Sequence, residues 1–206
     1  YLLISHHSQF VELNGQEISY RLKFSNIDNL AIIITVVFLI VVSIIAFVYH
    51  DVFFENDGIY FLLQGKQFLE EGPKNIESYD APITGSILFA FVGDIFNDDF
   101  FAIKLISVLS STGIVFLSYY IIRNLFGSKI AILGQLIFAL NPRFDFLSVS
   151  ALNELLPVLL ICIALYFVTK KSFSKIDIVW IGIFLGLSFM FRYQSFIILF
   201  YLFLEM

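Results

Sequence analysis

The chain alternates long apolar runs with short polar segments. Residues 30–49, LAIIITVVFLIVVSIIAFVY, contain no charged side chain, and a helix of about 20 residues covers about 30 Å, the thickness of the hydrocarbon core of a bilayer. Residues 105–122 form a second uncharged run, and residues 150–168 form another whose one charged residue is Glu154. Between them, residues 130–147 are apolar until Arg143 and Asp145. These four runs predict membrane-spanning helices.

The last apolar tract, residues 178–204, contains one charge, Arg192. It is too long for one untilted span and short for two, and we predict two helices that meet near Arg192. The predicted fold is therefore an all-α polytopic membrane protein with about five to six transmembrane helices. The chain begins with Tyr1 and ends close after this tract, so we expect a fragment whose C-terminal part is missing.

Two shorter helices are expected in the long segment between the first two spans. The stretch DGIYFLLQGKQFLEEG starts at Asp57 and stops at Gly72-Pro73, with Asn56 as a helix cap. Residues 86–96, SILFAFVGDIF, are too few to span. The first helix is predicted to rest on the membrane surface because its apolar residues lie largely to one side, and the second because it is too short to span.

Residues 1–29 are predicted to be a small cytoplasmic N-terminal segment, followed by one transmembrane domain, residues 30–206. The segment FVELNGQEISYRLKF alternates apolar and polar residues on either side of Asn14-Gly15. Because Asn-Gly favours the tight turn of a two-stranded hairpin, we expect a β-hairpin here.

Composition and charge support this class and suggest an orientation. The chain is 59% hydrophobic and only 14% charged, too little polar surface to coat a soluble globule. Lys and Arg of short loops stay on the cytoplasmic side, and under the five-helix count three basic segments share one side: Arg21 and Lys23; Arg123 and Lys129; Lys170, Lys171 and Lys175. Residues 50–100 then lie on the external side of a cell membrane or on the luminal side of the endoplasmic reticulum. They hold ten of the seventeen acidic residues and two lysines, so we expect no nucleic-acid partner.

Three charged residues are predicted to share the external edge of the membrane. Asp57 begins the first surface helix, Glu154 lies at the start of the fourth span, and Arg192 falls on the same face. An ionisable group at this depth costs a few kcal/mol and usually faces a cavity or a partner. The three side chains therefore predict a polar cleft. The alternative is that Glu154 and Arg192 are ordinary helix-end residues, or pair structurally with each other.

At these residues the sequence resembles a known family. The ordered segments DGIYFLLQGKQFLEEG, YDAPITGSILFAF, RNLFGSKIAILGQLIFALNP and ALNELLPVLLICIALYF are similar to the N-terminal half of the GT-C superfamily of membrane glycosyltransferases. The resemblance is greatest to the dolichyl-phosphate-mannose protein mannosyltransferase and aminoarabinose transferase type. It implies transfer of a mannose-like hexose from a polyprenyl-phosphate carrier, by an inverting reaction, to a protein, lipid or glycan acceptor.

The resemblance also implies roles for individual residues. The acidic residue of the family's first external loop is matched by Asp57, followed by Tyr60, and the family's Pro-containing segment is matched by Asp80 to Pro82. A second acidic residue is matched by Glu154, which follows Pro142. Tyr60, Asp80, Arg143 and Arg192 are the candidate substrate-binding residues. Many members have Asp-Glu in the first loop, whereas this chain has Gly58 at the second position.

The chemistry of the reaction fits these residue types. Transfer from a phosphate-linked sugar needs a base for the acceptor hydroxyl and a positive group for the phosphate. Asp57 suits the base, and Arg192 suits the phosphate because a guanidinium binds it bidentately. Glu154 can orient the acceptor or sugar, or help hold a divalent metal, although no ligand cluster in the sequence demands one. The competing class is a transporter or non-catalytic membrane subunit, but transporters place their charges near the middle of the bilayer.

Overall fold

The computed structural model describes residues 26–48, 56–72, 82–150, 152, 154–193 and 195, the side chains of residues 56 and 57 excepted. In this part of the chain every regular element is a helix, short turns join the helices, and there are no strands. Its helices are α1 Asn26–Val48, α2 Asn56–Glu71, α3 Ile83–Phe96, α4 Asp99–Phe126, α5 Ser128–Ala139, α6 Pro142–Val149, α7 Leu155–Thr169 and α8 Lys175–Phe191. The predicted all-α class is confirmed. The predicted hairpin and Asp80 lie outside the described residues.

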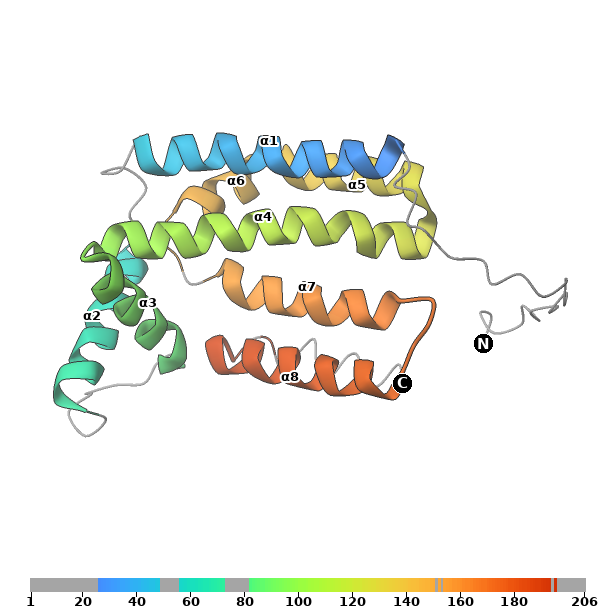
Figure 1. The fold of residues 1–206 in the computed structure, drawn as a ribbon. Coiled ribbons are helices and arrows are strands. Elements are labelled where there is room, and N and C mark those ends of the chain that lie inside the picture. The colour runs from blue at the N-terminus through green and yellow to red at the C-terminus, as the bar shows by residue number, and fades with distance from the viewer. Residues whose placement is uncertain are drawn as a thin grey trace, which may run out of the picture.

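The long helix α4 is the centre of the bundle (Figure 1). It packs against α1, α5 and α6 and also against α7, while α8 packs on α7. The pair α2 and α3 lies across one end of the bundle, where α3 contacts both α4 and α8. Both helices were expected in this segment, and α2 ends, as predicted, before Gly72. The left-handed φ of Gly72, +78°, is a backbone conformation that suits glycine after a helix.

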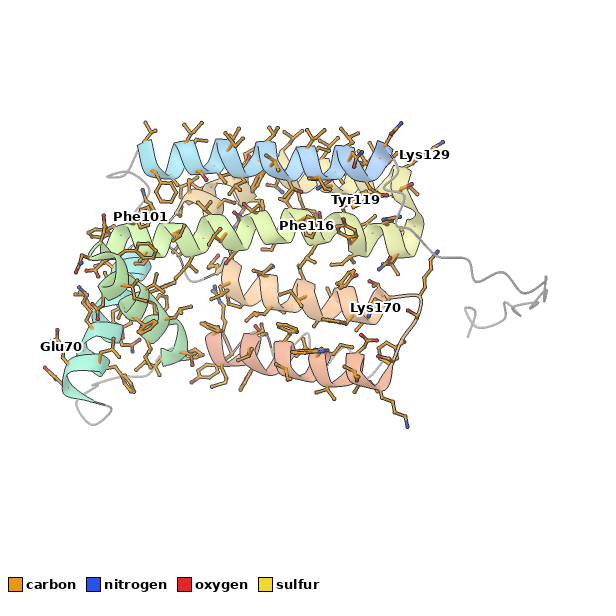
Figure 2. All side chains as sticks on the ribbon, in the orientation of Figure 1. Glu70, Phe101, Phe116, Tyr119, Lys129 and Lys170 are labelled. Carbon is orange, nitrogen blue, oxygen red and sulfur yellow. The ribbon has the colours of Figure 1, made fainter. Side chains whose placement is uncertain are left out.

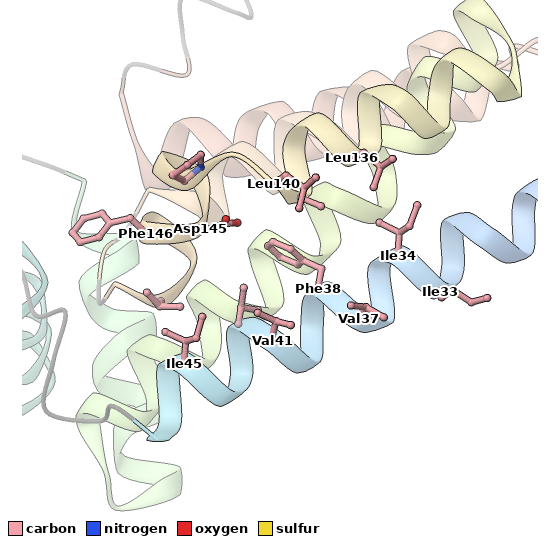
Figure 3. A pocket seen from close by; sticks show the side chains of 14 residues that line it. Ile33, Ile34, Val37, Phe38, Val41, Ile45, Leu136, Leu140, Asp145 and Phe146 are labelled. Carbon is pink, nitrogen blue, oxygen red and sulfur yellow. The ribbon is translucent and has the colours of Figure 1, made fainter.

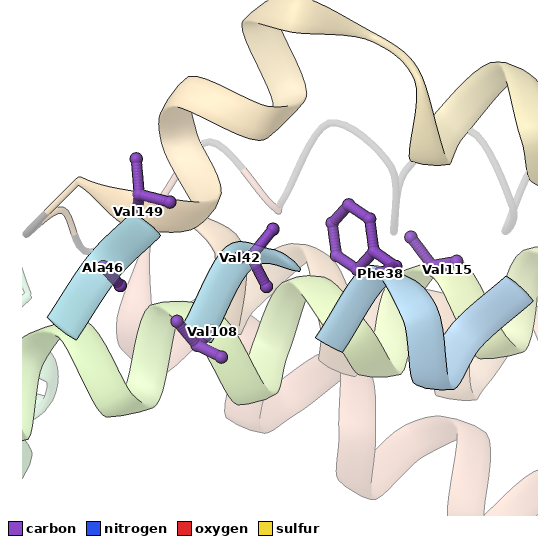
Figure 4. Packing of buried hydrophobic residues seen from close by; sticks show 6 residues of the cluster. All are labelled: Phe38, Val42, Ala46, Val108, Val115 and Val149. Atoms are coloured by element: carbon purple, nitrogen blue, oxygen red, sulfur yellow. The ribbon is translucent and has the colours of Figure 1, made fainter. Parts of the chain in front are cut away.

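Small and branched side chains bring α1 close to α4 and α6. Phe38, Val42 and Ala46 of α1 pack against Val108 and Val115 of α4, and Val149 of α6 joins them (Figure 4). Between helices in a membrane, close packing and polar contacts replace the hydrophobic driving force, because lipid tails are themselves apolar. The stability of this cluster therefore depends on how well the side chains fit together and not on the exclusion of water.

Polar contacts fasten α1 to its neighbours at the other end of the bundle. The hydroxyl of Tyr119 donates to Asp28 Oδ1 at 2.6 Å, and Arg123 pairs with the same oxygen at 2.9 Å. In the next turn the side-chain amide of Gln135 donates to Ala31 O and to Thr35 Oγ1, at 3.0 and 2.9 Å. Such interhelical hydrogen bonds fix the rotation of α1 about its own axis.

The third predicted span is broken in two. α5 ends at Ala139 and α6 begins at Pro142, with a bend of 59° between them. Pro142 has no backbone N–H and fits the first turn of a helix. The side chain of Asn141 accepts hydrogen bonds from the backbone N–H groups of Arg143 and Phe144, at 3.0 and 3.3 Å. Asn141-Pro142 therefore starts a new helix instead of continuing the old one.

Fewer helices reach spanning length than the sequence predicted. Among the described helices, α1 and α4, with 23 and 28 residues, are long and apolar enough to cross a bilayer, and the bent pair α5 and α6 would be a third. α7 and α8 have 15 and 17 residues, short of the roughly 20 that a span needs. The prediction of about five to six spans is too high for the described chain. α8 does end at Phe191, next to the predicted break at Arg192.

Gly65 allows the closest contact between α2 and α3. A Cβ at this position would lie 1.9 Å from the backbone oxygen of Ser86, whereas a Cβ at Gly182 in α8 would meet no atom within 4 Å. Beside this crossing the Ser86 hydroxyl donates to Gln64 Oε1 at 2.9 Å. The two helices are thus held at backbone contact distance by one glycine and one buried hydrogen bond.

We expect Gly65→Ala to destabilise the protein by about 1–3 kcal/mol, because the added methyl group forces the two backbones apart. Gly182→Ala is the matched control, and it should be neutral or stabilising by up to about 1 kcal/mol, since alanine favours a helix where nothing obstructs it. The midpoint of thermal unfolding in detergent measures both. Equal midpoints for the two variants would show that α2 and α3 do not cross at Gly65.

Candidate active site

One end of the bundle carries Glu154 and Arg192, and the other end carries basic turns. α2 and α3 lie at the first end, together with the start of α7 and the end of α8 (Figure 1). Lys129 and Lys170 lie at the opposite end from Glu70 (Figure 2). The turn that carries Lys129 and the turn that carries Lys170 therefore share one end of the bundle, as predicted. A hydrogen bond joins the two helices that lead into these turns, since Asn124 Nδ2 donates to Thr169 Oγ1 at 3.4 Å.

Glu154 and Arg192 form an ion pair at the end that carries α2 and α3. Glu154 immediately precedes α7, and Arg192 immediately follows α8 in an extended conformation. Because α7 and α8 are antiparallel neighbours, the start of one lies beside the end of the other. Arg192 Nη1 lies 2.9 Å from Glu154 Oε1, and the two side chains are 36% and 38% exposed. The charges are therefore together and accessible.

Buried hydroxyl groups lock the two helices next to this pair. Ser188 Oγ contacts the backbone oxygen of Pro157 at 3.0 Å and Ser195 Oγ at 2.8 Å. Ser188 is fully buried, and Pro157 belongs to the first turn of α7. The backbone on either side of the ion pair is thus fixed, which limits the positions that the guanidinium can take.

For the other predicted site residues in the described part of the chain, the structure gives a position in a helix. Asp57 is the second residue of α2, so its backbone lies at the positive N-terminal end of that helix; its side chain is not described. Tyr60 is 45% exposed on the next turn of α2. Arg143 is exposed in the first turn of α6, a helix that packs on α1 and α4, whereas Glu154 and Arg192 belong to the α7 and α8 hairpin. Whether Asp57 approaches the ion pair stays a prediction.

Two lysines that the sequence did not single out hold this end together. Lys66 of α2 forms an ion pair with Asp99 at the start of α4. The hydrogen bond that Lys66 donates to this carboxylate raises the pKa of Lys66, so its ammonium stays charged at neutral pH. Lys104, which immediately precedes the uncharged run of the second predicted span, is fully buried in α4 and donates from Nζ to the backbone oxygen of Ala46 at 3.1 Å. A single lysine beside an apolar run gives no sign of such a partner.

The described residues contain no group of three His, Cys, Asp or Glu side chains that could hold a metal ion. This statement does not extend to Asp57 and Asp80, whose side chains are not described. Glu154 already contacts Arg192, a cation, and a carboxylate paired in this way is a poor metal ligand on its own.

Comparison with known proteins decides the family. The sequence profile described as dolichyl-phosphate-mannose-protein mannosyltransferase matches residues 80–206, more than half of the chain. The chain belongs to this family. Searches of curated proteins and of solved structures found no match.

Membership in the mannosyltransferase family makes the chain a membrane glycosyltransferase of the GT-C type, which favours the enzyme over the transporter or non-catalytic subunit. The matched region contains Asp80, Arg143, Glu154 and Arg192. Asp57 precedes it, as does Tyr60, so the roles of these two residues rest on the resemblance of the first external loop alone.

Proposed function

We propose that this protein transfers a mannose-like hexose from a polyprenyl or dolichyl phosphate to a protein, lipid or glycan acceptor, on the external or luminal side of the membrane. The observation that carries the proposal is the accessible Glu154–Arg192 ion pair. It lies at the end of the bundle that also carries α2 and α3, away from the basic turns. A lipid-linked sugar phosphate presents its head at such an edge while its tail stays in the bilayer.

Arg192 is the phosphate-binding group in this proposal. A guanidinium keeps its charge and offers two parallel N–H donors to a phosphate. It is only 36% exposed, which strengthens its attraction for a charge relative to bulk water. Glu154 holds it in place before the donor binds. When phosphate takes over the guanidinium, the carboxylate of Glu154 becomes able to accept a hydrogen bond from a sugar or acceptor hydroxyl.

The transfer step needs a base, and Asp57 is the candidate. The acceptor oxygen attacks the anomeric carbon from the face opposite the phosphate, and the bond from that carbon to the phosphate oxygen breaks. The phosphate leaves with the electron pair, on the lipid carrier and against Arg192. Asp57 takes the proton of the acceptor hydroxyl. Attack from the opposite face inverts the configuration at the anomeric carbon.

Membranes that contain the full-length protein test this function. With radiolabelled dolichyl-phosphate mannose as donor, we expect label to pass to an acceptor and the released carrier to be dolichyl phosphate. In sealed vesicles of known orientation, an acceptor that cannot cross the membrane should be used only when the external or luminal face is outward. The matched membranes lack the protein. Transfer from nucleotide-linked mannose but not from the lipid donor would contradict the proposal.

A further inference from the structure

A short segment leads into Glu154 and is tied to the central helix of the bundle. Residues 150–154 connect α6 to α7. The hydroxyl of Ser107 in α4 donates to the backbone oxygen of Leu152 at 3.3 Å, and Ser107 is itself buried. Leu152 lies two residues before Glu154. One buried hydroxyl group therefore holds the backbone that approaches the ion pair.

The hydrogen bond of Ser107 differs from those of two later hydroxyl groups in the same helix. Ser111 and Thr112 both donate to the backbone oxygen of Val108, at 3.0 and 2.8 Å. Serine and threonine in a helix commonly bond in this way, because the backbone oxygens of the preceding turn are within reach. Ser107 instead bonds a residue 45 positions away in the sequence. Its hydroxyl group therefore contributes to the tertiary structure around Glu154 and not to α4 alone.

The neighbouring helix α6 gives the segment limited support. It has eight residues, and one side of it borders an apolar groove of about 530 Å³, which α1 and the end of α5 also line (Figure 3). The ion pair with Arg192 contributes little to the position of the segment, because both of its side chains are more than one third exposed. The place of Glu154 therefore depends on buried hydrogen bonds to its backbone neighbours.

Glu154 has one such hydrogen bond on each side of it along the chain. Before it, the backbone oxygen of Leu152 accepts from Ser107, and after it, the backbone oxygen of Pro157 lies 3.0 Å from Ser188 Oγ. The first bond joins the segment to α4, and the second joins α7 to α8, at whose end the cationic partner of Glu154 lies. A displacement of about 1 Å in a reacting group can lower a rate by about 10²-fold. Together the two bonds set where the carboxylate stands relative to the guanidinium.

We propose that Ser107 is a positioning residue for sugar transfer: its hydrogen bond to Leu152 places the carboxylate of Glu154 for contact with the sugar of the bound donor. The inference rests on the proposed function, in which Glu154 accepts a hydrogen bond from a sugar or acceptor hydroxyl. Ser107 is buried and acts through Glu154. Loss of its hydroxyl should therefore slow the transfer step and leave the binding of the donor phosphate by Arg192 intact.

Hydrogen exchange of the full-length protein in detergent tests the structural step. Ser107→Ala removes the hydrogen bond to Leu152, and Ser111→Ala is the matched control, because Ser111 is buried in the same helix but bonds within it. We expect the peptide that contains Leu152 and Glu154 to exchange its backbone amides about three- to tenfold faster in Ser107→Ala than in the unaltered protein. The Ser111→Ala protein should exchange this peptide at the unaltered rate.

Single-turnover transfer from dolichyl-phosphate mannose tests the functional step. Ser107→Ala should lower the rate at saturating donor about tenfold, with the donor concentration for half-maximal rate unchanged, while Ser111→Ala should stay within about twofold. In the Glu154→Gln background, Ser107→Ala should lower the rate by less than about twofold more, because the hydroxyl acts through that carboxylate. Equal losses in the two backgrounds would show a general effect on the structure and overturn the positioning role.

The positioning role and the proposed function fail in different ways. Unchanged exchange of the Leu152 peptide in Ser107→Ala would overturn the positioning role, whatever the reaction is. A normal rate of transfer in Glu154→Gln, together with faster exchange in Ser107→Ala, would instead contradict the part that the proposed function gives to Glu154 and reduce Ser107 to a structural residue.

Discussion

Asp57→Asn is expected to lower the rate of sugar transfer by about 10² to 10⁴, because general base catalysis contributes about that much. The amide has nearly the same size as the carboxylate but cannot take the proton of the acceptor hydroxyl. Folding should change little, because the loss of one negative charge in the first turn of α2 costs only about 0.3–1 kcal/mol. Single-turnover transfer from dolichyl-phosphate mannose measures the rate without product release.

Glu70→Gln is the matched control for this variant. Glu70 belongs to the same helix, is exposed, and lies near its other end, so loss of its charge should leave transfer within about twofold of the unaltered rate. A change confined to donor binding, with the single-turnover rate intact, would assign Asp57 to substrate binding. Near-normal turnover of Asp57→Asn would exclude Asp57 as the base.

Arg192→Gln is expected to reduce transfer by about 10²-fold or more, and Arg192→Lys by about tenfold to hundredfold, since an ammonium lacks the bidentate fork. Glu154→Gln should reduce transfer more than it reduces stability. The reason is the exposure of the pair. A buried pair loses about 3–5 kcal/mol when one partner is removed, but a pair more than one third exposed, as here, is worth only about 0–1 kcal/mol.

A double-mutant cycle separates the two roles of this pair. The variants are Glu154→Gln, Arg192→Gln and their combination, and thermal unfolding and transfer are measured for each. Lys171→Gln is the control for loss of a positive charge, because Lys171 is exposed and follows Lys170 at the opposite end of the bundle. We expect the three variants to unfold within about 1 kcal/mol of the parent while transfer falls. A double variant that folds better than either single one would show a structural pair and contradict the phosphate-binding role of Arg192.

Much of the fold followed from the lengths and boundaries of the apolar runs. The first span was expected from residue 30 and the helix begins at Asn26. The two helices between the first spans were expected with their ends close to those observed, because Gly72 ends α2 and residues 86–96 are closed by Asn97, which has a positive φ of 52°. The number of spans was overestimated. The helices of the last two described runs, α7 and α8, have only 15 and 17 residues. In addition, residues 130–147, which hydropathy alone counts as one run, are divided because Asn141 and Pro142 start a second helix there.

The sequence by itself determined the helical membrane class, the family and the presence of isolated charges at the ends of apolar runs, since each of these depends on composition, order or local spacing. It also indicated that Glu154 and Arg192 belong to one face. Only the tertiary structure decided which charge meets which. The distance of 2.9 Å between those two side chains and the burial of Lys104 against Ala46 both depend on how helices distant in sequence rotate and pack. Side-chain packing at helix crossings sets that rotation, and no periodicity within a single helix encodes it.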